Sequence, residues 1–249
     1  IGHDAGDAIT DADYNVAMGY LALSADTLGS NSVAIGYKAL GTQNFTTATD
    51  AYNVAVGFEA GGDITTGIHN TIIGGLAGDA LTDADSNIAI GVSALGTDTL
   101  GSKSVAIGLS ALATQNFTTA TDTFNTAVGF NAGLAVTTGI RNTLIGGLAG
   151  DALTTGYFNT AGAAVTTGSV NTLIGGLAGD ALTDADKNVA VGFGALTTDT
   201  LGSRSVAIGE QALAVQNFTT ATDTYNTAVG FNAGAAVTTG VQNTLIGGL

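Results

Sequence analysis

The sequence contains no cysteine, no proline and no tryptophan, and only 10% of its 249 residues are charged. Without cysteine the chain can form no disulfide and no thiolate metal site, so its redox compartment cannot be inferred from cysteine usage. Five basic residues stand against 20 acidic ones, which gives a formal net charge of -15. Nucleic acids and anionic membranes bind positively charged surfaces, so we expect neither as a partner.

Long apolar runs and histidines are also scarce. No stretch approaches the roughly 18 consecutive apolar residues of a membrane span, so we expect no span in this segment. General acid–base catalysis at neutral pH usually employs histidine, and the two histidines, His3 and His69, occupy different positions of the repeat described below. Serine and threonine are abundant, but they fall at repeated turn and ladder positions, as structural residues do. We therefore predict no enzymatic activity and no cofactor.

What the chain does contain is a repeated five-residue core of the form Asn/Ser, Val/Ile/Thr, small or apolar, Ile/Val/Met, Gly. The spacing is 17 residues, with 21 after each Ser-initiated copy and 12 after a shortened relative at Asn159. Four copies form a longer unit of 72 residues. The thirteen full copies begin at Asn15, Ser32, Asn53, Asn70, Asn87, Ser104, Asn125, Asn142, Asn171, Asn188, Ser205, Asn226 and Asn243.

Within each core, alternate residues share a face, as in a β-strand. Val33 and Ile35 lie on one side and Ala34 on the other, and Gly36 permits a corner. One repeat therefore predicts one coil of an all-β, parallel β-solenoid. We expect residues 1–249 to form one continuous domain of about 14 coils, roughly 65 Å long at one strand spacing per coil. The repeated Asn is expected to form a ladder that satisfies buried polar groups.

The third position of the core carries no charge in any copy. It is Ala in most repeats, and Ile72, Leu144, Leu173 and Leu245 in the others. A single coil encloses only one face of its strand, and we expect another chain to cover this apolar stripe. Closed cyclic association of identical rods covers one stripe per chain, so we predict a homotrimer or fibre self-association.

The segments Ser32–Gly36, Ser104–Gly108 and Ser205–Gly209 all read Ser-Val-Ala-Ile-Gly. They resemble the core of the YadA-like head of trimeric autotransporter adhesins. Other copies, such as 125–133 followed by Thr137-Thr-Gly139, resemble repeats of phage tail fibres and tail spikes. The resemblance implies a left-handed β-roll trimer in an extracellular fibre, on a cell surface or a virion, that attaches to a host glycan or protein receptor.

These repeats are longer than the usual adhesin head repeat, and the sequence shows no neck, coiled coil, membrane anchor or chaperone. Ile1 and Leu249 both lie in the middle of a repeat. We therefore expect the chain to be a segment of a longer fibre, of bacterial, archaeal or phage origin.

The four extra residues of the Ser-initiated repeats create the segment 43–50, which recurs at 115–122 and 216–223. Aromatic and polar side chains on projecting loops would suit binding of a glycan or another fibre. The alternative is that each Phe folds back and caps the widened coil. Each loop also contains an Asn-Phe-Thr glycosylation sequon. The candidate binding residues are Asn44, Phe45, Thr46, Asn116, Phe117, Thr118, Asn217, Phe218 and Thr219.

Two other functions remain open from the sequence, both for a monomeric solenoid. The acidic turns Asp7–Asp13, Asp79–Asp85 and Asp180–Asp186 supply the oxygen ligands that calcium prefers, although acidic turns are more often simply solvated, and we assign no metal ligand. A flat threonine-rich face would instead indicate ice binding, but most threonine pairs here fall in turns.

Overall fold

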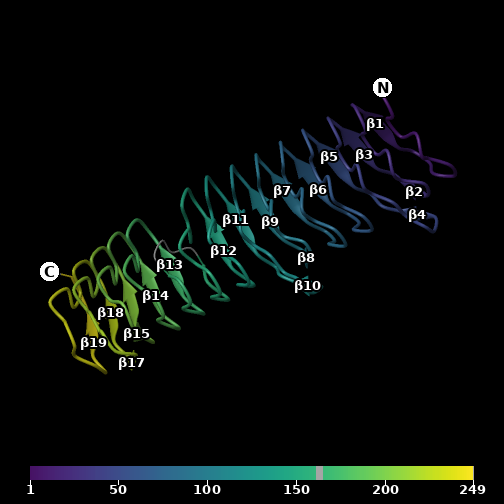
Figure 1. The fold of residues 1–249 in the computed structure, drawn as a ribbon. Coiled ribbons are helices and arrows are strands. Elements are labelled where there is room, and N and C mark those ends of the chain that lie inside the picture. Colours follow the sequence, from purple (N-terminus) through teal and green to yellow (C-terminus); the bar gives the residue numbers. More distant parts are fainter. Residues whose placement is uncertain (161–164, 249) are drawn as a thin grey trace.

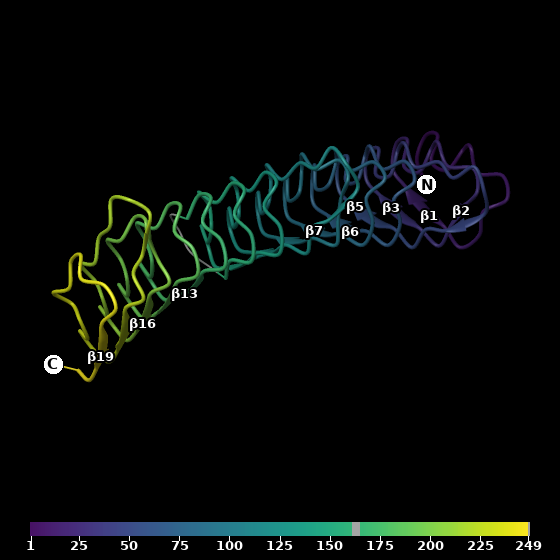
Figure 2. The same cartoon turned by 90° about the horizontal axis from the view of Figure 1, so that it is seen from below.

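The computed structural model describes residues 1–160 and 165–248, and in these ranges the chain is an all-β solenoid with parallel strands and no helix. Its coils stack into an elongated rod with the two termini at opposite ends (Figure 1). Seen from a second direction, the strands follow one side of the rod, which curves gently (Figure 2). The predicted all-β fold, a solenoid of parallel strands, is thus confirmed. Since the described ranges hold no helix, they hold none that could cross a membrane.

Thirteen three-residue strands, one from each full repeat, pair in strict register, so that Val33 lies beside Val54 and Ala34 beside Ala55. Thr160 of the short repeat bridges Thr143 and Thr172. The strands are β1 (Val16–Met18), β3 (Val33–Ile35), β5 (Val54–Val56), β6 (Thr71–Ile73), β7 (Ile88–Ile90), β9 (Val105–Ile107), β11 (Thr126–Val128), β12 (Thr143–Ile145), β13 (Thr172–Ile174), β14 (Val189–Val191), β16 (Val206–Ile208), β18 (Thr227–Val229) and β19 (Thr244–Ile246).

Shorter strands mark the repeats that carry the four-residue insertion. Each is a two-residue strand just before a Ser-initiated core, paired with one at the end of the inserted loop. The pairs are β2 (Gly29–Ser30) with β4 (Thr49–Asp50), β8 (Gly101–Ser102) with β10 (Thr121–Asp122), and β15 (Gly202–Ser203) with β17 (Thr222–Asp223). The insertion therefore widens the coil and does not interrupt the stack.

The third position of the core points into the solenoid. Ala34, Ala55, Ile72 and Ala89 are completely buried within a single chain, whereas the Val and Ile residues beside them point outward. The expectation that another chain covers the third-position stripe is therefore wrong. The reason is volume: the narrow interior already holds Leu side chains from the turns, which leaves room mainly for Ala at this position.

The interior of the coils is filled by two alternative residue sets. Some coils place Leu directly after the buried Ala of the turn, as at Leu40, and a polar residue three positions later, as at Gln43. Other coils place Gly61 and Ile64 at these positions, and a Cβ on Gly61 would lie 2.9 Å from Ile64 Cδ1. The two sets occur in alternating pairs of coils, except that three full coils of the second set, those that begin at Asn125, Asn142 and Asn171, occur in succession around the short repeat.

The repeated Asn and the corner Gly hold successive coils together. Asn53 Oδ1 accepts a hydrogen bond from the Asn70 amide (2.8 Å), and Asn53 Nδ2 donates to the Gly67 carbonyl (2.7 Å). The side-chain oxygen and nitrogen of the buried Asn53 thus both have hydrogen-bond partners, which confirms the predicted Asn ladder. At the corner, a Cβ on Gly36 would lie 2.1 Å from the Gly57 carbonyl oxygen, so the coils stack only with glycine there.

Candidate functional site: the outward face of the sheet

The second and fourth core positions form two side-chain columns along the outside of the thirteen strands. The fourth column is apolar in every strand, with Met18 in β1 and Ile or Val in the others, and the second contains only Val, Ile and Thr. These side chains are half-buried or exposed in one chain, from intermediate at Val56 to 62% exposed at Ile145 and 79% exposed at Ile246 in the last strand. A protein with net charge -15 thus carries a charge-free apolar face along most of its length, which soluble monomers rarely expose.

One edge of this face is formed by the residue before each core Asn or Ser. Backbone φ angles there lie between 49° and 64°, in the left-handed region, although none of these residues is glycine. Four of the five basic residues occur in this column, interleaved with aromatic rings. The Arg141 guanidinium, for example, lies 5.8 Å from the centre of the Phe124 ring and 5.1 Å from that of Phe158.

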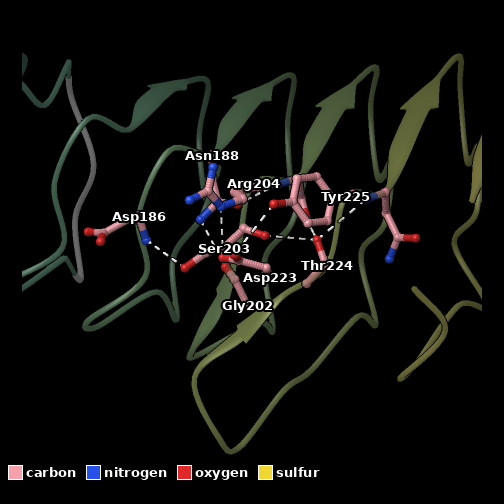
Figure 3. A network of polar contacts seen from close by, with 10 residues as sticks. Asp186, Asn188, Gly202, Ser203, Arg204, Asp223, Thr224 and Tyr225 are labelled. Atoms are coloured by element: carbon pink, nitrogen blue, oxygen red, sulfur yellow. Dashed lines mark hydrogen bonds and ion pairs between the residues drawn. The ribbon is translucent and has the colours of Figure 1, made fainter. Parts of the chain in front are cut away.

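Figure 3 shows one stretch of this edge, where Arg204 lies beside the Tyr225 ring and contacts Asp223. Arg204 Nε is 2.8 Å from Asp223 Oδ1, and its guanidinium carbon is 5.6 Å from the ring centre. The hydrogen bond to Asp223 and its charge raise the pKa of Arg204 above its ordinary value. This basic edge is therefore partly neutralised within the chain.

A second aromatic column follows the corner glycines near the N-terminal end. Tyr20 and Tyr37 stack with ring centres 5.6 Å apart, and Tyr37 stacks on Phe58 at 5.0 Å. All three rings are more than a third exposed. Further along the chain this position holds single Phe residues (Phe130, Phe193 and Phe231) separated by Gly, Val, Leu or Glu, so the column is not continuous.

The inserted loops do not present their aromatic residues. Phe45, Phe117 and Phe218 are 5%, 8% and 7% exposed, because each ring folds back over the widened coil. The prediction of outward aromatic contacts is therefore wrong for these three residues. Their neighbours are exposed, and a binding role for them stays a prediction: Asn44, Thr46, Asn116, Thr118, Asn217 and Thr219.

Sequence reasoning missed a buried polar network beneath each loop. Asp98 Oδ1 accepts from the Gly101 and Phe117 amides (3.1 and 2.9 Å), and Gln115 Nε2 donates to Asp98 Oδ2 (2.5 Å). Gln115 Oε1 in turn accepts from Asn125 Nδ2 (2.8 Å). The same network is built on Asp26 with Gln43 and on Asp199 with Gln216. It positions the loop and is structural, because every member is buried.

The acidic turns use their carboxylates to connect coils. Asp83 accepts from the Thr66 hydroxyl (2.7 Å) and Asp85 from the Ile68 amide (2.8 Å). Within the described ranges no three His, Cys, Asp or Glu residues are grouped to hold a metal ion. Asp79 lines a separate hollow with Asp63 and Glu59, and burial, followed by these two charges, raises the pKa of Asp79.

Threonine hydroxyls in the turns also face neighbouring coils. Thr82 Oγ1 donates to the Thr99 carbonyl (3.0 Å), and Thr183 Oγ1 to that of Thr200 (3.2 Å). Their hydroxyl protons are thus directed along the stack and not toward a flat outer surface, which gives an ice-binding face no support.

Comparison with family models, with curated proteins and with solved structures gave no match to this chain. The candidate site therefore rests on its own geometry, and its strongest feature is the charge-free outward face.

Proposed function

We propose that this chain is a structural and adhesive segment of an extracellular fibre and that three copies associate through the outward faces of their sheets. The observation that carries this proposal is the fourth core column, which is apolar in all thirteen strands and is Ile or Val in twelve of them. Residues on a solvent-exposed surface need not all be apolar, whereas residues on a face that is buried against identical copies must be.

The resemblance of the Ser-Val-Ala-Ile-Gly segments to YadA-like heads supports three copies and a left-handed coil. Cyclic symmetry supports the same arrangement, because three rods around one axis cover one face per chain and leave the loops outside. Two of the five basic residues contribute little to such an interface, since Lys103 and Arg204 already contact Asp122 and Asp223 of their own chain.

Attachment is assigned to the exposed polar residues of the inserted loops. The loops recur four and then six coils apart, which places them roughly 19 and 29 Å apart along the rod at one strand spacing per coil. A repeated polar contact at this spacing suits a multivalent glycan or protein receptor, because several weak contacts then act together.

The test is the mass of the native particle by light scattering, for the unchanged chain and for two variants. Ile90→Asp with Ile107→Asp places two charges on the outward face, and we expect the trimer to dissociate. Thr118→Asp with Thr119→Asp adds the same charge to an exposed loop and should leave the trimer intact. A monomeric unchanged chain, or equal behaviour of the two variants, would contradict the proposal.

A further inference from the structure

The short repeat at Asn159 lacks one defined part of a coil. Compared with 125–133, its sequence Asn159-Thr-Ala-Gly162 has no counterpart of the five residues Val128–Ala132. The residues just before and just after 161–164 nevertheless keep their usual places in the stack. Thr160 bridges the strands on either side of it, and Val165 is 2% exposed in the core. The missing part is therefore the end of the strand, the corner and the start of the turn.

A hollow of about 520 Å³ lies where these five residues would run. Its walls are two nearly identical segments, Ile145–Ala149 of the coil before and Ile174–Ala178 of the coil after. The same sequence at 73–77 provides a reference, because complete coils flank it. Ile73 is 37% exposed there, whereas Ile145 and Ile174 are 62% and 51% exposed.

The leucines of the walls show the same difference. Leu148 and Leu177 are 47% and 50% exposed, while Leu76 is only intermediate. The hollow is therefore apolar at its walls and open to solvent. The strands of the coils before and after the short repeat, β12 and β13, are labelled in Figure 1.

The backbone of both walls carries the hydrogen-bonding groups that normally hold a coil in place. In complete coils the corner Gly donates to the strand end before it, as Gly129 N does to Ile107 O (2.8 Å), and Asn131 N donates to Leu109 O (2.9 Å). At the hollow, the equivalent carbonyls of Ile145 and Gly147 accept no hydrogen bond from any residue in 1–160 or 165–248.

The opposite wall is complementary. Gly175 N and Leu177 N correspond to Gly192 N and Gly194 N, which donate to Ile174 O (2.8 Å) and Gly176 O (2.9 Å). Neither Gly175 N nor Leu177 N donates to another described residue, and the same is true of Gly150 N. Together the walls present two carbonyls on one side and two amides on the other, in the pattern of a parallel strand ladder.

We propose that this hollow binds a short segment of another polypeptide, in the strand-end and corner conformation of a complete coil, as the missing rung of the solenoid. Coils on either side of one missing rung are about 9.6 Å apart, which is twice the spacing of hydrogen-bonded strands and admits one layer of backbone. A peptide with the pattern branched aliphatic, Gly, apolar, any residue, Ala matches the missing five residues. As in strand addition to a sheet, main-chain bonds give affinity and side-chain pockets give specificity.

The register of the bound peptide follows from the complete coils. The N–H of its Gly donates to the Ile145 carbonyl and the N–H two residues later to the Gly147 carbonyl. Its first and third carbonyls accept from Gly175 N and Leu177 N, and its last accepts from Gly150 N. Glycine is required at the corner, because the backbones of adjacent coils approach closely there. This inference goes beyond the proposed function and does not depend on trimer formation.

The test uses a fluorescein-labelled peptide with the sequence of residues 127–133, Ala-Val-Gly-Phe-Asn-Ala-Gly, and polarisation measurements on the intact chain. We expect saturable binding. A peptide methylated on the nitrogen of its first Gly loses the bond to Ile145 O and should bind at least tenfold more weakly. Because this comparison uses unchanged protein, it does not depend on the folding of any variant.

Two protein variants and one matched control test where the peptide binds. Insertion of Val-Gly-Phe-Asn-Ala after Ala161 completes the coil and should reduce binding at least tenfold. Leu148→Asn makes one wall polar and should weaken binding severalfold, whereas Leu76→Asn, at the same repeat position between complete coils, should have no effect. Absence of binding at millimolar protein, insensitivity to N-methylation, or equal binding by the completed chain would each overturn the proposal.

Discussion

The coils of this rod come in two kinds that share one backbone path but differ in their interiors. In the pair that begins at Asn87 and Ser104, the interior holds Leu95 and Leu112 together with Asp98 and Gln115. In the next pair, glycines replace the leucines, and Val136 and Leu153 replace the polar residues. Only the polar kind carries an inserted loop.

The comparison shows why the longer sequence unit has four coils. Asp98 and Gln115 bond each other across two adjacent coils, so a polar residue in one coil requires its partner in the next. The apolar pair then completes the unit. A buried carboxyl group is tolerated without a cation because backbone amides and the Gln side chain satisfy it.

The largest expected effect comes from breaking the polar pair. In Gln115→Leu the buried Asp98 carboxyl and the Asn125 amide both lose a partner, and we expect the free energy of unfolding to fall by about 3 kcal/mol. Chemical denaturation followed by circular dichroism measures the change. Val136→Leu, at the same position of the apolar pair, should cost less than about 1.5 kcal/mol. Equal costs would show that the polar network contributes no stability.

The converse change should be somewhat smaller. Val136→Gln places a polar side chain in an apolar pair that lacks the matching Asp, and an unsatisfied buried amide costs about 2 kcal/mol. The same denaturation experiment measures it. If Val136→Gln is as stable as the unchanged chain, the two kinds of interior are interchangeable and the pairing argument fails.

A stabilising change is expected within the first polar pair. Thr123 Oγ1 is 2.5 Å from Ser104 Oγ and 3.0 Å from the Ser102 carbonyl, whereas the first pair has the buried Ala51 at this position. Ala51→Thr should restore these bonds and stabilise the chain by about 1 kcal/mol, and Thr123→Ala should lose a similar amount. A destabilised Ala51→Thr variant would show that the first pair packs differently.

The smallest effect concerns a carboxyl group that lies outside both interiors. Burial raises the pKa of Asp79, so its ionised form is disfavoured in the folded chain, and folding gains stability as the pH falls through this pKa. Asp79→Asn should therefore raise the melting temperature slightly at pH 7 and lose this advantage near pH 3. Asp180→Asn, at the same repeat position, is the control. No difference between the two pH values would contradict this account of Asp79.

The sequence predicts the coil well because its signals are local. Alternation in Val33-Ala34-Ile35 and the glycine after it define a strand and a corner, and both are observed. The ladder of buried Asn was also predictable, because a polar residue repeated in register must be satisfied in register.

The sequence does not reveal which strand face is inside. Alternation shows that Val33 and Ile35 share a face, but the choice depends on how much space the turn side chains, such as Leu40, leave in the interior. The polar pair was missed although a signal exists: Leu40 occurs with Gln43, while Gly61 occurs with Ile64. The hollow could not be predicted either, because it depends on where both neighbouring coils lie.

The central claim is that other copies of the chain cover the outward face, and the rate of thiol labelling tests it most directly. Since the chain has no cysteine, single cysteines can be placed at Ile107 on the outward face and at Thr118 on an exposed loop. We expect Ile107→Cys to react with a maleimide at least tenfold more slowly than Thr118→Cys in native conditions, and equally fast in denaturant. Equal rates in native conditions would mean that the outward face is open to solvent and would contradict the proposed assembly.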